Sequence, residues 1–226
     1  MHRYDRKGCT SCGRCAHACP ALALETAGKE MTVDEVLTEV KKDEVFYQNS
    51  GGGMTLTGGE PFFQPRFAVA LLALAKRDGM HTCVETCGAA AYDVLAEAAQ
   101  YTDLFLYDVK ETDSETHRTY TGAPNGLIFD NLAKLDASGA QTVLRCPVIP
   151  GVNDNERHFL GVCAMAGRLK NVQQIDIEPY HPLGISKAEA FGKTALHTDA
   201  KITPKETAEG WVAIFKQNTA VPVFIS

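Results

Sequence analysis

The sequence predicts an α/β protein built on one parallel β-sheet that curves into a full or partial barrel. Segments with apolar residues at helical spacing alternate with short apolar runs that are typical of buried strands. The helical segments repeatedly end at a glycine, as at Gly79 and Gly139. With 226 residues, of which 45% are hydrophobic, the chain can bury one substantial core, as a single domain or as a domain with a small appendage.

The regular alternation begins at Thr32, a predicted N-cap, with Glu35 three residues later in a capping-box pattern. We expect helices over residues 32–48, 66–79, 91–100, 125–139, 156–170 and 204–217. We expect strands over residues 54–58, 81–86, 103–110, 140–148, 173–180 and 221–225. Because a helix separates each pair of strands, neighbouring strands should be parallel. The alternation opens with a helix, so we expect a sheet that lacks its first strand.

Four cysteines lie close together near the start of the sequence. Cys9, Cys12, Cys15 and Cys19 form a C-x2-C-x2-C-x3-C run that is closed by Pro20. This spacing is typical of [4Fe–4S] ligation, in which three thiolates hold one cluster and the fourth ligates the other cluster of a pair. A disulfide framework would need an oxidising compartment, and nothing in the sequence indicates one. The run therefore predicts an iron–sulfur site.

We expect the chain to have two parts. Residues 1–30 should form half of a ferredoxin-like segment, closed by a strand and turn over residues 21–30, and residues 31–226 should form the barrel. The formal charge of -6, with acidic and basic residues mixed along the chain, argues against a nucleic-acid-binding protein. No apolar run approaches a membrane span and the first residues lack the apolar centre of a signal peptide, so we expect a cytoplasmic location.

Charged or titratable residues follow the predicted strands at their carboxyl ends, where α/β barrels carry their active sites. In strand order these residues are Gly58-Gly59-Glu60-Pro61, Glu85, Asp108 and Lys110, Arg145, and His181. Asp108 and Lys110 share strand parity with Leu104 and Leu106 and should face the interior. Taken singly, these features fit an ordinary turn, a local ion pair and an exposed histidine. Five successive strands that deliver such groups to one rim instead predict a ligand site.

An ordered series of motifs carries a family resemblance. The motifs are SGGGMTLTGGEPFFQP, VETCG, DLFLYDVKETDSETHRTYTGAPN, LRCPVIPGVND and EPYHPLG. Together they resemble the barrel of the glycyl-radical-enzyme activating proteins, which belong to the radical S-adenosylmethionine superfamily and include the pyruvate formate-lyase activating enzyme. The resemblance extends from Cys9 to the C-terminus, and the series is far more specific than any single motif.

The resemblance implies a partial (β/α)6 barrel that holds a [4Fe–4S] cluster and S-adenosylmethionine. It implies that the reduced cluster cleaves the sulfonium to a 5′-deoxyadenosyl radical, which removes a hydrogen atom from a glycine of a partner glycyl radical enzyme. A donor such as flavodoxin or ferredoxin would supply the electron. The protein would orient the cofactor and exclude water and oxygen.

The resemblance also assigns residues to the cofactor pocket. Gly58, Gly59 and Glu60 match the segment that holds the methionyl amino group. Arg145 would face the methionyl carboxylate, and His181 matches a residue near the nucleoside. A mixed set of acidic and basic side chains suits a ligand with an ammonium, a carboxylate and an adenine.

The run of Asp108, Val109 and Lys110 matches another part of the same pocket. Glu85 stands where relatives often have aspartate, and with Asp108 it would hold a cation beside the carboxylate. His117 and the Thr121-Gly122 stretch lie where the glycine loop of the partner would approach.

The sequence departs from the family in one respect, because it lacks the C-x3-C-x2-C motif that binds the catalytic cluster. In the family this motif lies upstream, after the first strand. We therefore expect an N-terminally truncated sequence, a fragment or a gene model begun at an internal methionine, that does not cleave S-adenosylmethionine by itself. Two other functions stay open: a non-catalytic electron-transfer or scaffold protein on a degenerate barrel, and a lyase or aldolase with Lys110 as a Schiff-base nucleophile.

A first prediction concerns iron content. Protein with this sequence, supplied with iron and sulfide without oxygen, should retain little or substoichiometric iron, because Cys19 lacks the partner motif that completes a pair of clusters. Iron and sulfide analysis measures this, and two full clusters per chain would contradict it. The genomic DNA upstream of Met1 separates the functions: an open frame that encodes C-x3-C-x2-C supports the activating enzyme, and a nearby stop codon supports the scaffold protein.

Overall fold

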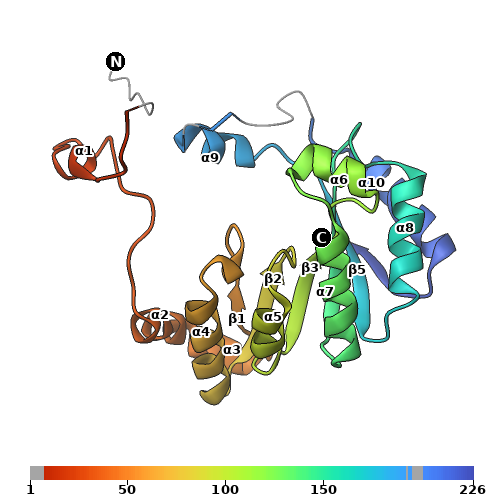
Figure 1. Cartoon of the computed structure of the whole chain (residues 1–226), viewed down its shortest axis with the longest axis horizontal. Coiled ribbons are helices and arrows are strands. Elements are labelled where there is room, and N and C mark those ends of the chain that lie inside the picture. Colours follow the sequence, from red (N-terminus) through yellow and green to blue (C-terminus); the bar gives the residue numbers. More distant parts are fainter. Residues whose placement is uncertain (1–7, 192, 195–200) are drawn as a thin grey trace.

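One curved parallel sheet organises the computed structural model, which describes residues 8–191, 193–194 and 201–226 (Figure 1). The strands are β1 (Gly53–Leu56), β2 (His81–Thr86), β3 (Leu104–Asp108), β4 (Thr142–Val148), β5 (Val172–Pro179) and β6 (Val223–Ile225). They lie side by side in sequence order, and each pairs in parallel with the next. Within the described residues β1 and β6 are the two edges, so the sheet is an open, partial barrel. The predicted α/β class and all six predicted strands are confirmed.

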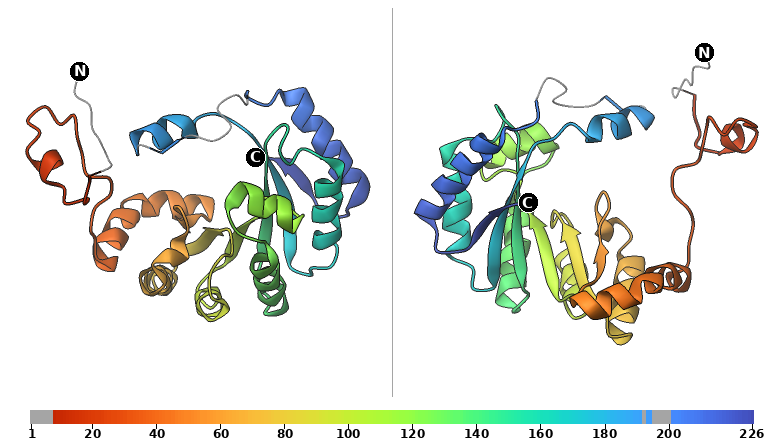
Figure 2. Two further views of the ribbon diagram at one scale, coloured as in Figure 1. Left: turned by 45° about the horizontal axis from the view of Figure 1, so that its top comes forward. Right: turned by 180° about the vertical axis from the view of Figure 1, so that it is seen from behind.

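Five helices cover the convex side of the sheet (Figures 1 and 2). They are α4 (Pro65–Arg77), α5 (Tyr92–Ala99), α7 (Gly126–Ala137), α8 (Glu156–Ala166) and α10 (Lys205–Asn218). Each lies in the connection between two consecutive strands, as the alternation predicts. No helix in the described ranges is long and apolar enough to cross a membrane.

The segment before β1 begins as predicted but does not form a single helix. Thr32 caps α2 (Val33–Val40): its hydroxyl accepts from the Glu35 amide at 3.3 Å, and Glu35 Oε2 accepts from the Thr32 amide at 2.7 Å. The predicted capping box is therefore confirmed. A 3-10 turn, η1 (Lys41–Asp43), then separates α2 from α3 (Glu44–Ser50) and breaks the helix predicted over residues 32–48.

Several features outside the sheet differ from the prediction. Three short helices were not predicted, α1 (Arg14–His17), α6 (Ser114–Thr121) and α9 (Gly184–Ala190). The strand predicted within residues 21–30 is wrong, because these residues form turns and bends without a strand. Leu22, with φ 49°, and Gly28, with φ 85°, lie in the left-handed region, which interrupts any extended path there.

Side-chain alternation on β3 separates the core from the site. Phe105 and Tyr107 are completely buried, and the Tyr107 hydroxyl donates to the carbonyl of Ile128 on α7 at 2.6 Å. These side chains therefore face the helices on the convex side. Leu104, Leu106 and Asp108 have the opposite parity and face the concave side, as predicted.

The turn after β2 provides a stability prediction. A Cβ on Gly88 would lie 1.7 Å from the hydroxyl of the buried Tyr107, and Gly88 has φ +70°. Gly79 has a similar φ of +79°, but a Cβ there meets nothing within 4 Å. Gly79→Ala should therefore cost only the left-handed strain, about 1–2 kcal/mol. Gly88→Ala should add an overpacking cost of about 1–3 kcal/mol. Urea unfolding of both variants measures the difference, and equal losses would contradict the assigned contact.

Candidate functional site

The concave face carries a row of charged side chains near the carboxyl ends of β2 to β5. Asp108 pairs in register with Arg145, and Arg145 pairs with Asp176. Residues that pair across parallel strands point to the same face of a sheet. Glu85 joins them because it pairs with the β3 residue two positions before Asp108, and Glu178 joins because it lies two residues after Asp176. The structure thus brings the predicted residues Glu85, Asp108 and Arg145 onto one surface.

Arg145 is held between two carboxylates. Its Nη1 lies 2.6 Å from Glu85 Oε2, its Nε donates to Glu178 Oε1 at 2.5 Å, and its Nη2 also contacts Glu178 Oε1. The three side chains are only 20%, 32% and 21% exposed. The resemblance placed Arg145 opposite a methionyl carboxylate and Glu85 beside a cation, whereas here the two side chains bind each other. Glu178 was not predicted, although the alternation IDIE in residues 175–178 places two acidic side chains on one face of β5.

Glu60 joins the segment after β1 to the end of β2. It is the N-cap of the short 3-10 helix η2 (Pro61–Phe63) and accepts from the Phe62 amide at 3.3 Å. Its carboxylate also accepts from the Thr86 hydroxyl at 2.9 and 3.0 Å. The amide and the thiol of Cys87 each donate to it at 3.1 Å. Burial, together with the Glu60 carboxylate, raises the pKa of Cys87, which favours the neutral thiol as the donor to this carboxylate.

Gly58 and Gly59 leave open space next to Glu60. Gly58 has φ 153°, and a Cβ on either glycine would meet no atom within 4 Å. Glycines of this kind allow a ligand to approach the backbone closely. The segment therefore combines an accessible backbone with a carboxylate that is fixed by the end of the next strand.

At the end of β3 the side chains of Asp108 and Lys110 lie together, and Val109 points to the opposite face. Asp108 is 18% exposed, and Lys110 Nζ lies 3.6 Å from its Oδ2. Burial raises the pKa of Asp108 to about 6, against the lowering effects of Lys110 and Arg145. Val109 is completely buried on the opposite face, and its amide donates to the Arg145 carbonyl at 2.7 Å. Val109 therefore contributes core packing and strand pairing, and its side chain does not face the concave site.

The two histidines assigned by the resemblance have different settings. His181 is exposed in the loop that follows β5 and lies outside the Arg145 ion pairs. His117 is only 4% exposed, and its Nδ1 lies 2.6 Å from the Ala123 carbonyl and 2.9 Å from the Thr121 hydroxyl. The side chain of His117 is thus buried in the turn after α6 and is not available to an approaching partner loop, whereas Thr121 and Gly122 are exposed.

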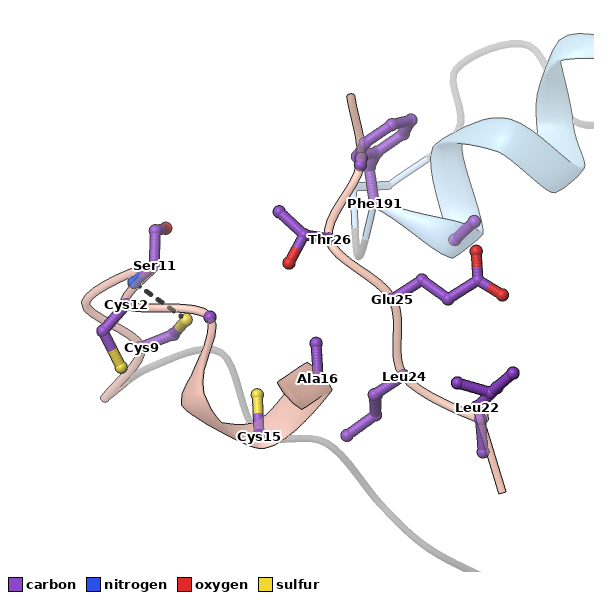
Figure 3. A pocket seen from close by; sticks show the side chains of 14 residues that line it. Cys9, Ser11, Cys12, Cys15, Ala16, Leu22, Leu24, Glu25, Thr26 and Phe191 are labelled. Atoms are coloured by element: carbon purple, nitrogen blue, oxygen red, sulfur yellow. Dashed lines mark hydrogen bonds between the residues drawn. The ribbon is translucent and has the colours of Figure 1, made fainter. Parts of the chain in front are cut away.

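The segment that carries the cysteine run lies apart from the sheet (Figure 1), and part of the run lines a cavity of about 660 Å³ (Figure 3). Cys9, Cys12 and Cys15 line this cavity together with Phe191, the residue after α9. Cys19 is not among the lining residues, and its Sγ accepts from the Ala23 amide at 3.3 Å. The structure thus divides the run into three and one, although in the described part of the chain no three Cys, His, Asp or Glu side chains are close enough to hold a metal ion.

Backbone amides stabilise the thiolate forms of two of these cysteines. Hydrogen bonding from the Arg14 backbone lowers the pKa of Cys12, and the amides of Leu24 and Ala23 lower the pKa of Cys19. Iron binds the thiolate, so these environments suit iron ligation. Among the described residues, none of these four cysteines is in a disulfide.

The charge on the concave face favours a cationic ligand. Four carboxylates, from Glu85, Asp108, Asp176 and Glu178, lie there with Arg145 among them. Lys110 is the second basic group at this end of the sheet. An excess of buried or half-buried carboxylates lowers the energy of a positively charged group placed among them.

Comparisons with known sequences place the chain in the radical SAM superfamily. Residues 6–161 match the radical SAM superfamily. The chain is 46% identical over 186 residues to the isethionate sulfite-lyase activating enzyme of Oleidesulfovibrio alaskensis, which covers 81% of this chain and 60% of that protein. It is 37% identical over 222 residues to the trans-4-hydroxy-L-proline dehydratase activating enzyme of Clostridioides difficile, which covers 84% of this chain and 73% of that protein. The chain spans 60% to 62% of the length of the isethionate sulfite-lyase activating enzymes that it matches.

Solved structures agree with these sequence matches. A domain of a pyruvate-formate lyase-activating enzyme from Bacteroides vulgatus is similar to this chain with a TM-score of 0.64 and 25% identity, covering 77% of this chain and 99% of that domain. A radical SAM methyltransferase from Sphaerobacter thermophilus also gives a TM-score of 0.64, at 12% identity, covering 89% of this chain and 59% of that protein. The second match shows a shared fold alone.

The raised pKa of Asp108 predicts a pH-dependent stability. Between about pH 4 and pH 6 the unfolded chain ionises this carboxyl while the folded chain keeps its proton, so stability falls as the pH rises. Relative to Asp108→Asn, the wild type should lose on the order of 2–3 kcal/mol between pH 4 and pH 7. Denaturant unfolding across this range measures the loss. Asp130→Asn on the exposed face of α7 removes the same charge as a control, and parallel curves for wild type and Asp108→Asn would contradict the prediction.

Proposed function

Since this chain belongs to the radical SAM superfamily, and within it to the activating enzymes of glycyl radical enzymes, we propose that it forms the S-adenosylmethionine-binding barrel of such an activating enzyme. The acidic concave face carries this proposal. S-adenosylmethionine has two cationic groups, an ammonium and a sulfonium, and a face with more carboxylates than basic groups favours both. When bound together, a reduced [4Fe–4S] cluster and S-adenosylmethionine supply the radical that removes hydrogen from a glycine.

Each part of the face would bind a different part of the cofactor. Gly58 and Gly59 leave the backbone accessible, and the carboxylate of Glu60 beside them would hold the methionyl ammonium. Arg145, fixed by Glu85 and Glu178, would present its remaining positive edge to the methionyl carboxylate. His181, exposed in the loop after β5, would lie near the nucleoside.

The end of β3 completes the proposed pocket. Asp108 and Lys110 would bind from the side chain, and Val109 from its backbone, since its side chain is buried in the core. Asp108 is half-neutral near pH 6, so cation binding beside it would favour its ionised form.

We further propose that residues 1–30 are a [4Fe–4S]-binding segment that needs a second cysteine motif, absent from this sequence, for full occupancy, and that residues 31–226 are the barrel. Cys9, Cys12 and Cys15 share one cavity of about 660 Å³, while Cys19 is directed elsewhere by its own hydrogen bond. This division matches the arrangement in which the fourth cysteine serves a second cluster. The proposed partners are a glycyl radical enzyme and an electron donor such as flavodoxin or ferredoxin, in the cytoplasm.

The test is S-adenosylmethionine binding by this chain, since its sequence lacks the C-x3-C-x2-C motif and cleavage is not the expected readout. Lys110→Met should weaken binding about 10- to 100-fold, because it removes a charge-assisted hydrogen bond to the ligand. Lys205→Met is the matched control: like Lys110, Lys205 lies 3.6 Å from a carboxylate, but on α10, away from the concave face. Calorimetric titration measures both. Absence of binding by the wild type, or equal affinities in both variants, would overturn the proposal.

A further inference from the structure

Two buried asparagines hold the segment that follows β3. We infer that one of them, Asn153, is a positioning residue that sets the Asp108–Lys110 part of the site relative to Arg145. The inference rests on the proposed function, although the contacts that support it are all hydrogen bonds within this chain. Asn153 lies in the loop between β4 and α8, and in the described part of the chain its side-chain hydrogen bonds all go to backbone groups.

Asn153 connects the ends of two strands. Its Nδ2 donates to the Lys110 carbonyl at 2.7 Å and to the Pro147 carbonyl at 2.7 Å. Its Oδ1 accepts from the Ile149 amide at 2.8 Å. The side chain is 4% exposed, so these contacts have no competition from solvent. Both amide hydrogens of Asn153 therefore hold the end of β3 next to the end of β4. Strand β3 carries Asp108 and strand β4 carries Arg145.

A second asparagine fixes the next two residues of the same segment. Asn125, at the N-terminal end of α7, donates from Nδ2 to the Glu111 carbonyl at 3.0 Å and to the Thr112 carbonyl at 3.1 Å. It is also 4% exposed. The carbonyls of three consecutive residues are therefore satisfied by asparagine side chains from two other loops rather than by regular secondary structure.

Buried backbone carbonyls need hydrogen-bond partners, so the path of this segment depends on the two asparagines. Lys110 is the residue whose carbonyl Asn153 holds and whose ammonium lies 3.6 Å from Asp108. Without Asn153 the carbonyl would turn toward another donor and would change the direction of the Lys110 side chain. A displacement of about 1 Å in a positioning group can cost on the order of a hundredfold.

The opposite end of the sheet offers a matched control. Asn171, just before β5, donates from Nδ2 to the Asp136 carbonyl at 2.8 Å and accepts from Gln141 Nε2 at 3.4 Å. It too binds a backbone carbonyl of a distant segment, here the last turn of α7, but at the amino ends of the strands. A purely structural role of asparagine connections predicts similar effects at both ends, whereas a positioning role predicts an effect on ligand binding at Asn153 alone.

The experiment compares Asn153→Ala, Asn153→Asp and Asn171→Ala in the full chain. Asn153→Asp keeps the size and the acceptor but replaces the donor with an oxygen that faces two carbonyls. Circular dichroism checks that each variant folds. If Asn153→Asp does not fold, Asn153→Ala is compared with Asn171→Ala by itself. Calorimetric titration with S-adenosylmethionine should show at least about a tenfold weaker affinity for both Asn153 variants and an unchanged affinity for Asn171→Ala. Wild-type affinity in a folded Asn153 variant would overturn the inference.

Hydrogen exchange separates this inference from the proposed function. If the wild type does not bind S-adenosylmethionine, the proposed function fails, and exchange of the Val109–Asp113 amides then decides the positioning role. Faster exchange there in Asn153→Ala, with no change in Asn171→Ala, supports the role. Unchanged exchange at these amides in Asn153→Ala overturns it.

Discussion

The ion pairs of Arg145 make the charged concave face possible. Arg145 lies on β4, but it reaches past β3 to Glu85 on β2 and also binds Glu178 on β5. Adjacent strands lie about 4.8 Å apart, so this one side chain connects strands that are three spacings, roughly 14 Å, apart across the sheet. Carboxylates that are half-buried at such spacing repel one another unless a cation lies among them. The same contacts fix the guanidinium in one orientation before a ligand binds.

The hydrophobic core on the convex side of the sheet depends on the same alternation of side chains along the strands. On β3 the residues that face the helices are completely buried, and those that face inward end in Asp108. A shift of one residue in register would place Tyr107 on the concave side and Asp108 in the core, where it has no partner. The hydrogen bond from Tyr107 to the Ile128 carbonyl and the close approach of Gly88 to the same hydroxyl both act against such a shift. Stability and site geometry are therefore set by one pattern.

The strands and the helices on the convex side could be predicted because burial imposes a clear period on their sequences. The elements that could not be predicted bury little. Helix α6, SETHRTYT, has no apolar stripe and depends on Asp113, whose Oδ1 accepts from the Thr116 amide at 2.9 Å. The helix predicted over residues 32–48 has continuous helical propensity, and the 3-10 turn at Lys41–Asp43 that breaks it carries no sequence signal. Within residues 21–30 the predicted strand has no neighbouring strand with which to pair.

The candidate site divides in the same way. Charged residues at strand ends were predictable, because strand parity alone brings Glu85, Asp108 and Arg145 to one face. Glu178 has a parity signal, because it alternates with the apolar residues of β5. The prediction for this strand instead used His181, which is exposed in the loop that follows it. Cys87 and Asn153 act through contacts between loops that are distant in sequence, and no local pattern encodes such contacts. His117 shows the converse error, because a position in a matching motif does not reveal that the side chain turns inward.

Helix α9 lies between the loop that carries His181 and the cavity of the cysteine run. It begins three residues after His181 and ends beside Phe191, which lines the cavity of Cys9, Cys12 and Cys15. One end of this short helix therefore lies near the loop after β5, and the other end lies at the cavity of the three cysteines. A group that fills this cavity would therefore contact the residue that follows α9, the helix that begins three residues after His181.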